Sequence, residues 1–440
     1  MVAPSPVAPS PVEAAPVGSS PPSRLSVSLL PVRRTLGPTG SLAVLASLIV
    51  TFLASSSAPT PLYAVYQAEW GFSPITTTVI FGVYALAVLS SLLVFGKLSD
   101  HLGRKPVLLA ALAVQAGAML VFAAAADVST LLAARVVQGL ATGAASAAVG
   151  AAMLDIDRRR GAVTNSIAPG IGTGAGAIVS ALVVQFLPAP THLIYFVLFG
   201  LFVLQAMALS AVPETVTSKA GAIASLTPEL SLPASVRRPV AIALPVLFAV
   251  WSLAGFYGSL GPALLGGLVH SRAALYGGLP LFVLAGAAAL SVVALRNTAT
   301  RQVMYVGTVG LAVGVAITLV AVDAGSVAGF FAGTVVAGIG FGSGFQGGIR
   351  MVMPQAERHE RAGVLSLLYV VSYLGLGIPA VIAGVLVVHG GGLLTTTREY
   401  GVAVIVLAAL ALIGLFVNRP ARTACPVRRA YPEPVRVAGE

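Results

Sequence analysis

Charged residues are scarce in this chain of 440 residues. Asp, Glu, Lys and Arg make up 9% of the sequence, whereas hydrophobic residues make up 57%. A soluble domain carries about a quarter charged residues, so this chain could not cover a folded surface with polar groups. The composition excludes a soluble globular protein and indicates an integral membrane protein. The apolar runs are unbroken rather than alternating, which excludes a transmembrane β-barrel and predicts helices.

Cysteine and the common catalytic motifs are also missing. Cys425 is the only cysteine, which excludes a disulfide framework and a cysteine-based metal site. The short loops contain no phosphate-binding G-x-x-x-x-G-K-S/T motif, no zinc-ligand spacing and no Ser/His/Asp set. The sequence therefore predicts no enzyme, no metal and no cofactor. The net charge is +11, but the basic residues lie between apolar runs, so we expect a lipid bilayer and not nucleic acid as the partner.

Twelve apolar runs are long enough to cross a bilayer, which takes about 20 residues per helix. They cover 41–62, 74–98, 105–126, 128–153, 161–187, 192–212, 240–266, 274–295, 302–322, 326–349, 362–388 and 400–418. The polar connection 214–239 divides them into six and six, so we expect two helical halves, 40–213 and 240–418. Residues 1–39, rich in Pro, Ser and Ala, predict a disordered tail, and 419–440 form a second tail.

The basic residues predict the orientation in the membrane. With a cytoplasmic N-terminus, the outer loops hold only Arg272 and Arg398, and both termini are cytoplasmic. The cytoplasmic loops then hold fourteen basic residues: Lys97, Arg104, Lys105, Arg158, Arg159, Arg160, Lys219, Arg237, Arg238, Arg296, Arg301, Arg350, Arg358 and Arg361. We expect a multi-pass protein of the plasma (cell inner) membrane.

A charged turn at residues 96–105 joins the second and third apolar runs. Asp100 is an anion at a helix end and needs a cationic or hydrogen-bonding partner, and Arg104 and Lys105 can reach it. Gly96 permits close backbone approach to a neighbouring helix, and Gly103 lets the chain turn tightly. A topology anchor would not require this spacing of glycines and charges, so we favour a functional role. The second half repeats the turn in degenerate form at 295–302.

This turn resembles the signature of the major facilitator superfamily between spans two and three, with His101 where Arg or Lys is usual. Arg135, Gln138 and Gly139 resemble the family's second motif, on span four. The resemblance covers about 40–418 and implies an all-α fold of twelve helices in two pseudo-symmetric halves. It also implies a cytoplasmic latch that stabilises the outward-open state, formed by Gly96, Asp100, Gly103, Arg104, Lys105 and an acid at the end of span four. Asp155 is the better candidate for that acid, and Asp157 is expected to be a solvated neighbour of the following arginines.

Arg135 is the only basic residue expected inside a span. Placing Arg at mid-helix costs about 2.5–3.5 kcal/mol or more, so we expect a role in coupling or substrate binding, shared with Gln138 one turn on. No acidic residue lies at a span centre, so its partners must be carbonyls, hydroxyls, water or substrate. A structural Arg that ties span four to a neighbouring helix is the alternative.

Span five carries Pro169, Gly170, Gly172 and Gly174, which predict a bent helix with a close packing interface. Antiporters of the resembled family carry a Gly- and Pro-containing motif on this span, which favours export. Polar and aromatic residues at interior depth are candidates to line a cavity: Tyr63, Tyr84, Trp251, Tyr257, Phe341, Phe345, Gln346, Tyr369 and Tyr373. Ordinary packing is the alternative for each of them alone.

The nearly uncharged lining favours a small hydrophobic or weakly polar substrate. The sequence thus predicts a monomeric secondary transporter similar to drug or metabolite:proton antiporters, which exports such compounds with a proton gradient by alternating access. His192, His270 and His389 are expected in solvated loops and not as proton carriers. Gradient-driven uptake of a small solute, and a membrane sensor or enzyme without transport, are the alternatives.

Overall fold

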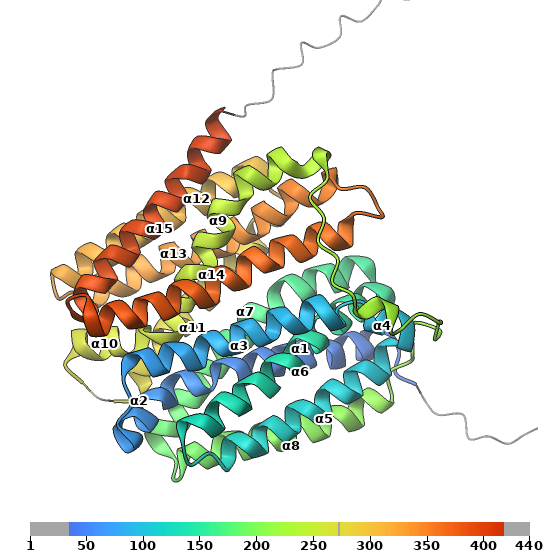
Figure 1. Ribbon diagram of the computed structural model, residues 1–440, viewed down its shortest axis with the longest axis horizontal. Coiled ribbons are helices and arrows are strands. Elements are labelled where there is room, and N and C mark those ends of the chain that lie inside the picture. Colours follow the sequence, from blue (N-terminus) through green and yellow to red (C-terminus); the bar gives the residue numbers. More distant parts are fainter. Residues whose placement is uncertain (1–34, 272, 418–440) are drawn as a thin grey trace, which may run out of the picture. The chain divides into compact units, whose positions relative to one another are not determined.

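The computed structural model describes residues 35–271 and 273–417, and all regular elements in these ranges are helices (Figure 1). Within them, twelve helical segments are long and apolar enough to span a membrane. They run Pro38–Trp70, Pro74–Phe95, Arg104–Ala123, Val128–Ile156, Arg158–Phe186, Pro190–Ser210, Ala234–Ser259, Leu275–Ala294, Thr300–Asp323, Val327–Gln355, Arg361–His389 and Gly392–Val417. Each predicted span is therefore matched by a helix, and the all-helical twelve-span fold is confirmed. The predicted tails lie almost wholly outside the described residues.

The first half contains seven longer helices and one short helix. They are α1 (Pro38–Ser57), α2 (Pro59–Trp70), α3 (Pro74–Phe95), α4 (Leu98–Leu102), α5 (Arg104–Ala123), α6 (Val128–Ile156), α7 (Arg158–Phe186) and α8 (Pro190–Ser210). One hydrophobic cluster joins these spans and includes the fully buried Phe52, Met119 and Tyr195. The span predicted at 41–62 is longer than expected, because α1 and α2 together reach Trp70.

The second half has an equivalent set of helices. They are α9 (Ala234–Ser259), α10 (Gly261–Val269), α11 (Leu275–Ala294), α12 (Thr300–Asp323), α13 (Val327–Val352), α14 (Arg361–His389) and α15 (Gly392–Val417). Two 3₁₀ turns, η1 (Ala224–Leu226) and η2 (Met353–Gln355), complete the described elements. Val250, Leu311 and Ala337 belong to the main core cluster of this half.

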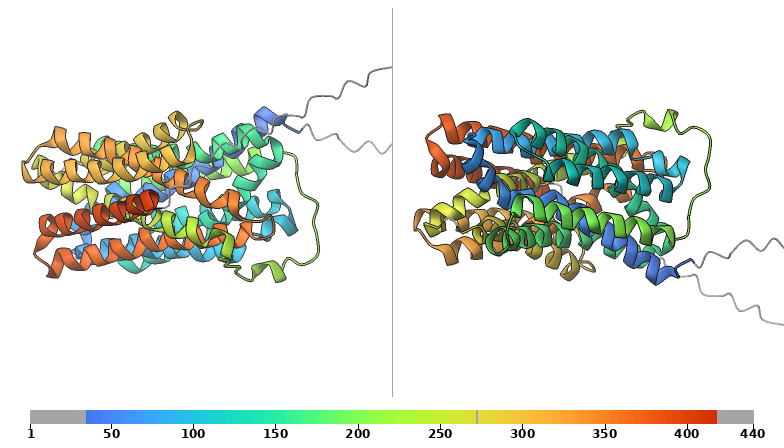
Figure 2. Two further views of the ribbon diagram at one scale, coloured as in Figure 1. Left: turned by 90° about the horizontal axis from the view of Figure 1, so that it is seen from above. Right: turned by 90° about the horizontal axis from the view of Figure 1, so that it is seen from below.

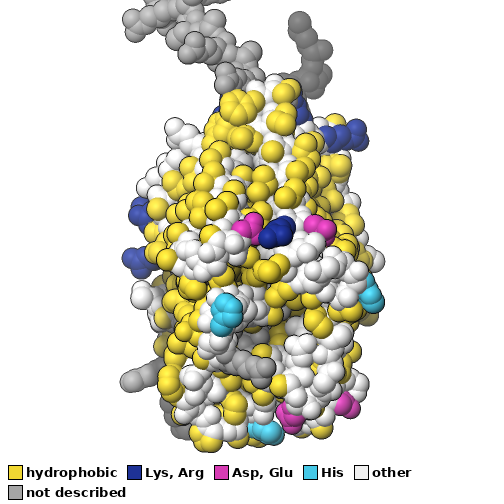
Figure 3. All heavy atoms as spheres, turned by 90° about the vertical axis from the view of Figure 1, so that its left-hand side faces the viewer, with side chains coloured by type: hydrophobic (Ala, Val, Ile, Leu, Met, Phe, Trp, Pro, Cys, Tyr) yellow, Lys and Arg dark blue, Asp and Glu magenta, His cyan; other side chains and the backbone are white. Residues whose placement is uncertain are grey.

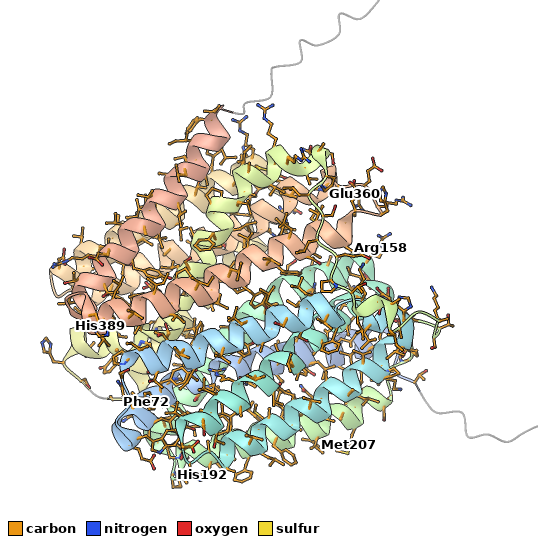
Figure 4. The ribbon with its side chains drawn as sticks, viewed as in Figure 1. Phe72, Arg158, His192, Met207, Glu360 and His389 are labelled. Carbon is orange, nitrogen blue, oxygen red and sulfur yellow. The ribbon has the colours of Figure 1, made fainter. Side chains whose placement is uncertain are left out.

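The ends of the spans fall on two sides. We call the side that holds residues 96–105 the turn side and the opposite side the far side. Arg158 and Glu360 lie at the turn side, whereas Phe72, His192 and His389 lie at the far side (Figure 4). Figure 3 looks onto the far side, where most side chains are hydrophobic or uncharged.

The two halves meet along α3 with α14 and along α7 with α11, which lie side by side (Figures 1 and 2). Small residues allow the close approach. A side chain on Gly82 of α3 would lie 2.9 Å from Val381 of α14. On α7, one on Gly170 would lie 3.0 Å from Ala289 of α11.

The glycines of α7 face two neighbours. Gly170 and Gly174, four residues apart, face α11 of the second half. Gly172 and Gly176 point the opposite way and contact α1 within the first half. Since residues four apart share a helix face and residues two apart do not, this spacing produces two close interfaces where the sequence predicted one. Pro169 lies inside α7, as expected.

Candidate functional site

The charged turn is held by a network around Arg104. Gly103 separates α4 from α5 with φ of 99°, a conformation that side-chain-bearing residues rarely adopt. Arg104 then forms an ion pair with Asp100, donates from Nη1 to Ser99 Oγ at 2.8 Å and donates from Nε to Asp155 Oδ2 at 3.0 Å. The structure thus brings Asp100, Arg104 and Asp155 together as the sequence predicted.

Asp157 is a neighbour of the following arginines, as expected, but it also has a structural role. Its carboxylate caps the N-terminus of α7, because Oδ1 accepts the backbone N–H groups of Arg159 and Arg160 at 2.9 Å each. An acidic side chain at this position satisfies helix N–H groups and complements the helix dipole. The Asp at the end of α6 therefore joins the network, and the Asp two residues later fixes the next helix.

Glu214 is a member of the network that sequence reasoning missed. Its two carboxylate oxygens accept the backbone N–H groups of Arg104 at 2.9 Å and Lys105 at 2.8 Å, so a residue of the linker caps the start of α5. A side chain on Gly103 would lie 2.8 Å from Glu214 Oε2. Gly103 is thus required both for its φ and for the room that it leaves. The signal in the sequence that could have indicated this contact is an acidic residue at the start of the linker, on the same side of the membrane as the basic turn.

Two details of the predicted latch are wrong. Lys105 does not reach Asp100, since its Nζ donates to the carbonyls of Ser210, at 2.5 Å, and Val212, at 3.0 Å. Gly96 approaches no neighbouring helix, because a side chain there would meet only the carbonyl group of Leu92, one turn back in its own chain.

The linker binds to the turn at three more places. Lys97 pairs with Glu229, His101 Nδ1 lies 3.1 Å from the carbonyl of Ala220, and Lys219 N–H donates to the carbonyl of His101 at 2.8 Å. Together with Glu214, these contacts tie the linker to the first half. The hydrogen bonds of the Arg104 network end on α4, α6 and the linker, and none of those described reaches a helix of the second half.

Arg135 lies fully buried in α6. Its guanidinium donates from Nε to Tyr63 Oη at 3.1 Å and from Nη1 to the carbonyl of Ser56 at 2.9 Å and to Gln138 Oε1 at 2.7 Å. The ring of Tyr84 lies 5.1 Å from the guanidinium carbon, within cation–π distance. Its partners are a carbonyl, a hydroxyl and an amide, as the absence of acidic residues at span centres predicted.

A break in the first span frees a second carbonyl next to that of Ser56. Pro59 has no N–H, so the carbonyl of Ser55 lacks the donor that a continuous helix would place four residues later. Gln138 Nε2 donates to that carbonyl at 2.9 Å, next to the bond from Arg135 to Ser56. Inside a membrane each freed carbonyl must find a protein partner. Arg135 and Gln138 therefore hold α6 against the junction of α1 and α2.

The second half has an uncharged counterpart of the contact between Arg135 and Tyr63. Tyr257 Oη lies 2.9 Å from Thr334 Oγ1, and both are buried. Thr334 is the residue that repeats the sequence position of Arg135. The structure buries Tyr63, Tyr84 and Tyr257 in contacts between helices, so none of them is open to a cavity in this state.

Trp251 is the centre of an aromatic cluster in the second half. Its ring stacks on Tyr373 with centroids 5.5 Å apart, and Phe341 and Phe345 meet it edge-on at 5.8 and 5.5 Å. All four rings are half-buried. Its indole N–H has no acceptor among the described residues. Here the structure brings together four of the predicted lining residues from α9, α13 and α14.

The other predicted residues lie apart from this cluster. Gln346 of α13 donates to the carbonyl of Val292 on α11 at 3.4 Å, and its Oε1 is buried without a donor among the described residues. Tyr369 lies on α14, one turn before Tyr373. His192, His270 and His389 are exposed, as expected, but only His270 lies in a connection, because His192 is in the first turn of α8 and His389 ends α14. No group of three metal-binding side chains occurs in the described ranges.

Comparison with known proteins identifies the class. The model of the major facilitator superfamily matches residues 43–301, more than half of the chain. Twelve spans, the charged turn and the buried Arg of α6 agree with that match, and the chain belongs to the major facilitator superfamily of secondary transporters. It is thus a multi-pass membrane protein with a small-molecule substrate and not an enzyme.

Solved structures agree on the fold. The nucleoside transporter NupG and a point mutant of it each superpose with a TM-score of 0.63 at 13% sequence identity, covering 86% of this chain and 98% of theirs. At this identity the likeness shows the fold alone. A search of curated proteins finds no match.

Proposed function

We propose that this transporter exports small hydrophobic or weakly polar compounds in exchange for protons. The observation that carries the proposal is the Trp251 cluster, which places half-buried aromatic rings beside the contact between the halves. Arg135 is the only buried charged side chain among the described residues. A sugar phosphate or a di-acid would need several charged or polar partners there, whereas a hydrophobic compound would not.

The turn side is proposed to face the cytoplasm of a plasma membrane. The basic residues of the loops support this orientation, because cytoplasmic loops carry an excess of Lys and Arg. On the far side Arg398 is paired with Asp323 at 2.8 Å, which offsets its charge. The protein would act as a monomer with both termini in the cytoplasm.

The Arg104 network is proposed to act as the conformational latch. Among the described residues the network bonds only within the first half and the linker. We propose that this is the state open to the turn side, in which the network has no partner in the second half. When the halves rock to close the turn side, Asp100 and Arg104 would meet the second half and stabilise the outward-open state.

We propose that proton coupling involves Asp100, Asp155 or water linked to Arg135. Among the described residues the spans bury no carboxylate that could carry the proton. A proton bound near Arg135 would be disfavoured by the like charge. If the Tyr63 hydroxyl or the Ser56 carbonyl moved away from Arg135, the repulsion between Arg135 and a bound proton would change. Protonation would then depend on whether the two halves are open to the turn side or to the far side.

Uptake of a small solute is the second candidate, and it takes support from the structural likeness to a nucleoside transporter. A membrane sensor that binds without moving its ligand is the third. The test is flux into proteoliposomes with an imposed proton gradient, using acridine, ethidium, uridine and succinate in parallel. The proposal expects acridine to move against the proton flow. Movement of uridine or succinate along with protons would favour uptake, and binding with no flux would favour a sensor.

A further inference from the structure

The unpartnered indole N–H of Trp251 requires an explanation. Its nitrogen is buried and has no acceptor among the described residues, although it lies in a well-packed helix. A buried donor without an acceptor costs free energy, and each such group in a native structure needs an explanation. A ligand that brings an acceptor to this nitrogen would recover that free energy.

The rings around Trp251 select the shape of such a ligand. Tyr373 stacks on the indole with an interplanar angle of 29°, while Phe341 and Phe345 stand at 66° and 83° to it. One parallel ring and two edge-on rings form the arrangement in which a further flat aromatic ring gains stacking and edge contacts together. Because the four rings are half-buried, each keeps part of its surface for a ligand.

The location of the cluster ties it to the transport cycle. Phe81 and Ala85 of α3 pack on Leu376 and Ala380 of α14, and Trp251 and Tyr373 pack against this group. The contact between the halves thus covers the edge of the aromatic cluster. Separation of α3 and α14 would uncover this edge of the cluster, and we infer that it would expose the indole N–H. A ligand bound there stabilises the separated state, because only that state offers the hydrogen bond.

The surrounding charge selects against cations. Arg135 is the only buried charged side chain among the described residues. Its guanidinium lies 5.1 Å from the ring of Tyr84 on α3, the helix that packs against α14. A cationic ligand at the cluster would meet this positive charge without a buried carboxylate to offset it. A neutral acceptor meets no such penalty.

We propose that Trp251, Tyr373, Phe341 and Phe345 form the binding site for a flat, uncharged aromatic compound with a ring acceptor that bonds to the Trp251 indole N–H. This proposal deepens the proposed function, on which it rests, by naming the chemical class of the substrate.

The tryptophan content of the chain allows a direct test. Trp70 and Trp251 are the only two tryptophans. The variant Trp70→Phe reports on the proposed site alone. The variant Trp251→Phe keeps only Trp70, which stacks on Tyr66 at the end of α2. Quenching of Trp70 measures the effect of probe that has merely partitioned into the detergent. Fluorescence quenching is titrated with acridine, with anthracene, which has the same shape but no acceptor, and with N-methylacridinium, a cation of the same shape.

We expect acridine to quench Trp70→Phe saturably and Trp251→Phe only in proportion to its concentration. Anthracene and N-methylacridinium should bind at least about fivefold more weakly than acridine, the equivalent of one net hydrogen bond. Tyr373→Leu in the Trp70→Phe background should weaken acridine binding by about fivefold, whereas Phe331→Leu, a half-buried ring of α13 outside the cluster, should not. Equal binding of acridine and N-methylacridinium would overturn the proposal, and so would saturable quenching of Trp70.

The outcome is separable from that of the proposed function. Acridine binding at Trp251 without gradient-driven flux would refute proton-coupled export and leave the site standing. Flux of acridine that Tyr373→Leu and Trp251→Phe both leave unchanged would refute the site and leave export standing. Each variant should elute from size-exclusion chromatography like the wild type, which shows that a loss of binding is not caused by misfolding. Acridine should also raise the melting temperature of the wild type, which shows binding to the folded protein.

Discussion

Replacing Arg135 tests whether the buried guanidinium couples transport or only holds α6 in place. Arg135→Met removes the charge and keeps a side chain of similar length. It leaves the Tyr63 hydroxyl, the Ser56 carbonyl and the Gln138 amide oxygen without their donor. Arg135→Lys keeps the charge, but its single ammonium cannot reproduce the planar set of donors.

The expected effect of Arg135→Met on stability is the difference of two large terms. Hydrogen bonds to a charged group contribute about 1.5–3 kcal/mol each, so three acceptors amount to roughly 4–9 kcal/mol. Burial of the charge costs several kcal/mol, which methionine relieves. We therefore expect Arg135→Met to lower the free energy of unfolding by only about 1–4 kcal/mol, so that the folded protein can still be purified.

Transport should respond differently. We expect Arg135→Met, like Arg135→Ala, to abolish gradient-driven flux and Arg135→Lys to retain part of it. The assay is flux into proteoliposomes, with thermal unfolding in detergent measured on the same preparations. Gradient-driven flux of Arg135→Met at the wild-type rate would refute a coupling role. If Arg135→Lys unfolds as readily as Arg135→Met and also loses all flux, the structural role alone would account for both variants.

Three further predictions concern the latch and the helix contacts. Asp100→Asn should strongly reduce transport while membrane insertion stays normal, since Arg104 loses one of its two charged partners and keeps only Asp155; wild-type flux would argue against the latch. Glu214→Gln should lower the free energy of unfolding by about 0.5–1 kcal/mol, because an amide cannot accept both N–H groups at the start of α5. A melting temperature equal to that of the wild type would contradict the capping role. Gly172→Ala should lower the melting temperature because a methyl group would clash with α1, whereas Gly200→Ala of α8, with nothing within 4 Å, should not; equal melting temperatures would show that α1 and α7 can move apart freely.

The parts of the site that could be predicted from sequence are those with local causes. Apolar run length determines the spans, and the spacing of Asp100, Gly103 and Arg104 within one turn brings the charges together. The resemblance to the family implied an acid at the end of span four, and Asp155 was chosen over Asp157 because it lies nearer the apolar run. The first two inferences need only the period of a helix and the side on which a loop lies.

The missed features depend on contacts between distant segments. Glu214 caps α5 from more than a hundred residues away, and no local pattern shows which linker carboxylate reaches a helix start. The Pro59 break could have been read as a helix interruption, but its pairing with Gln138 requires the packing of α6 against α1. The aromatic cluster was predicted as a set of candidates, and the structure alone separates Trp251, with its unpartnered N–H, from the buried Tyr257.

Proton-coupled export is tested most directly by following acridine in proteoliposomes that carry a pH gradient and that hold the protein in one orientation. We predict that acridine moves opposite to the protons, from the turn side to the far side, and that a protonophore stops the movement. Acridine flux that ignores the pH gradient, or that follows the protons in the same direction, would contradict proton-coupled export.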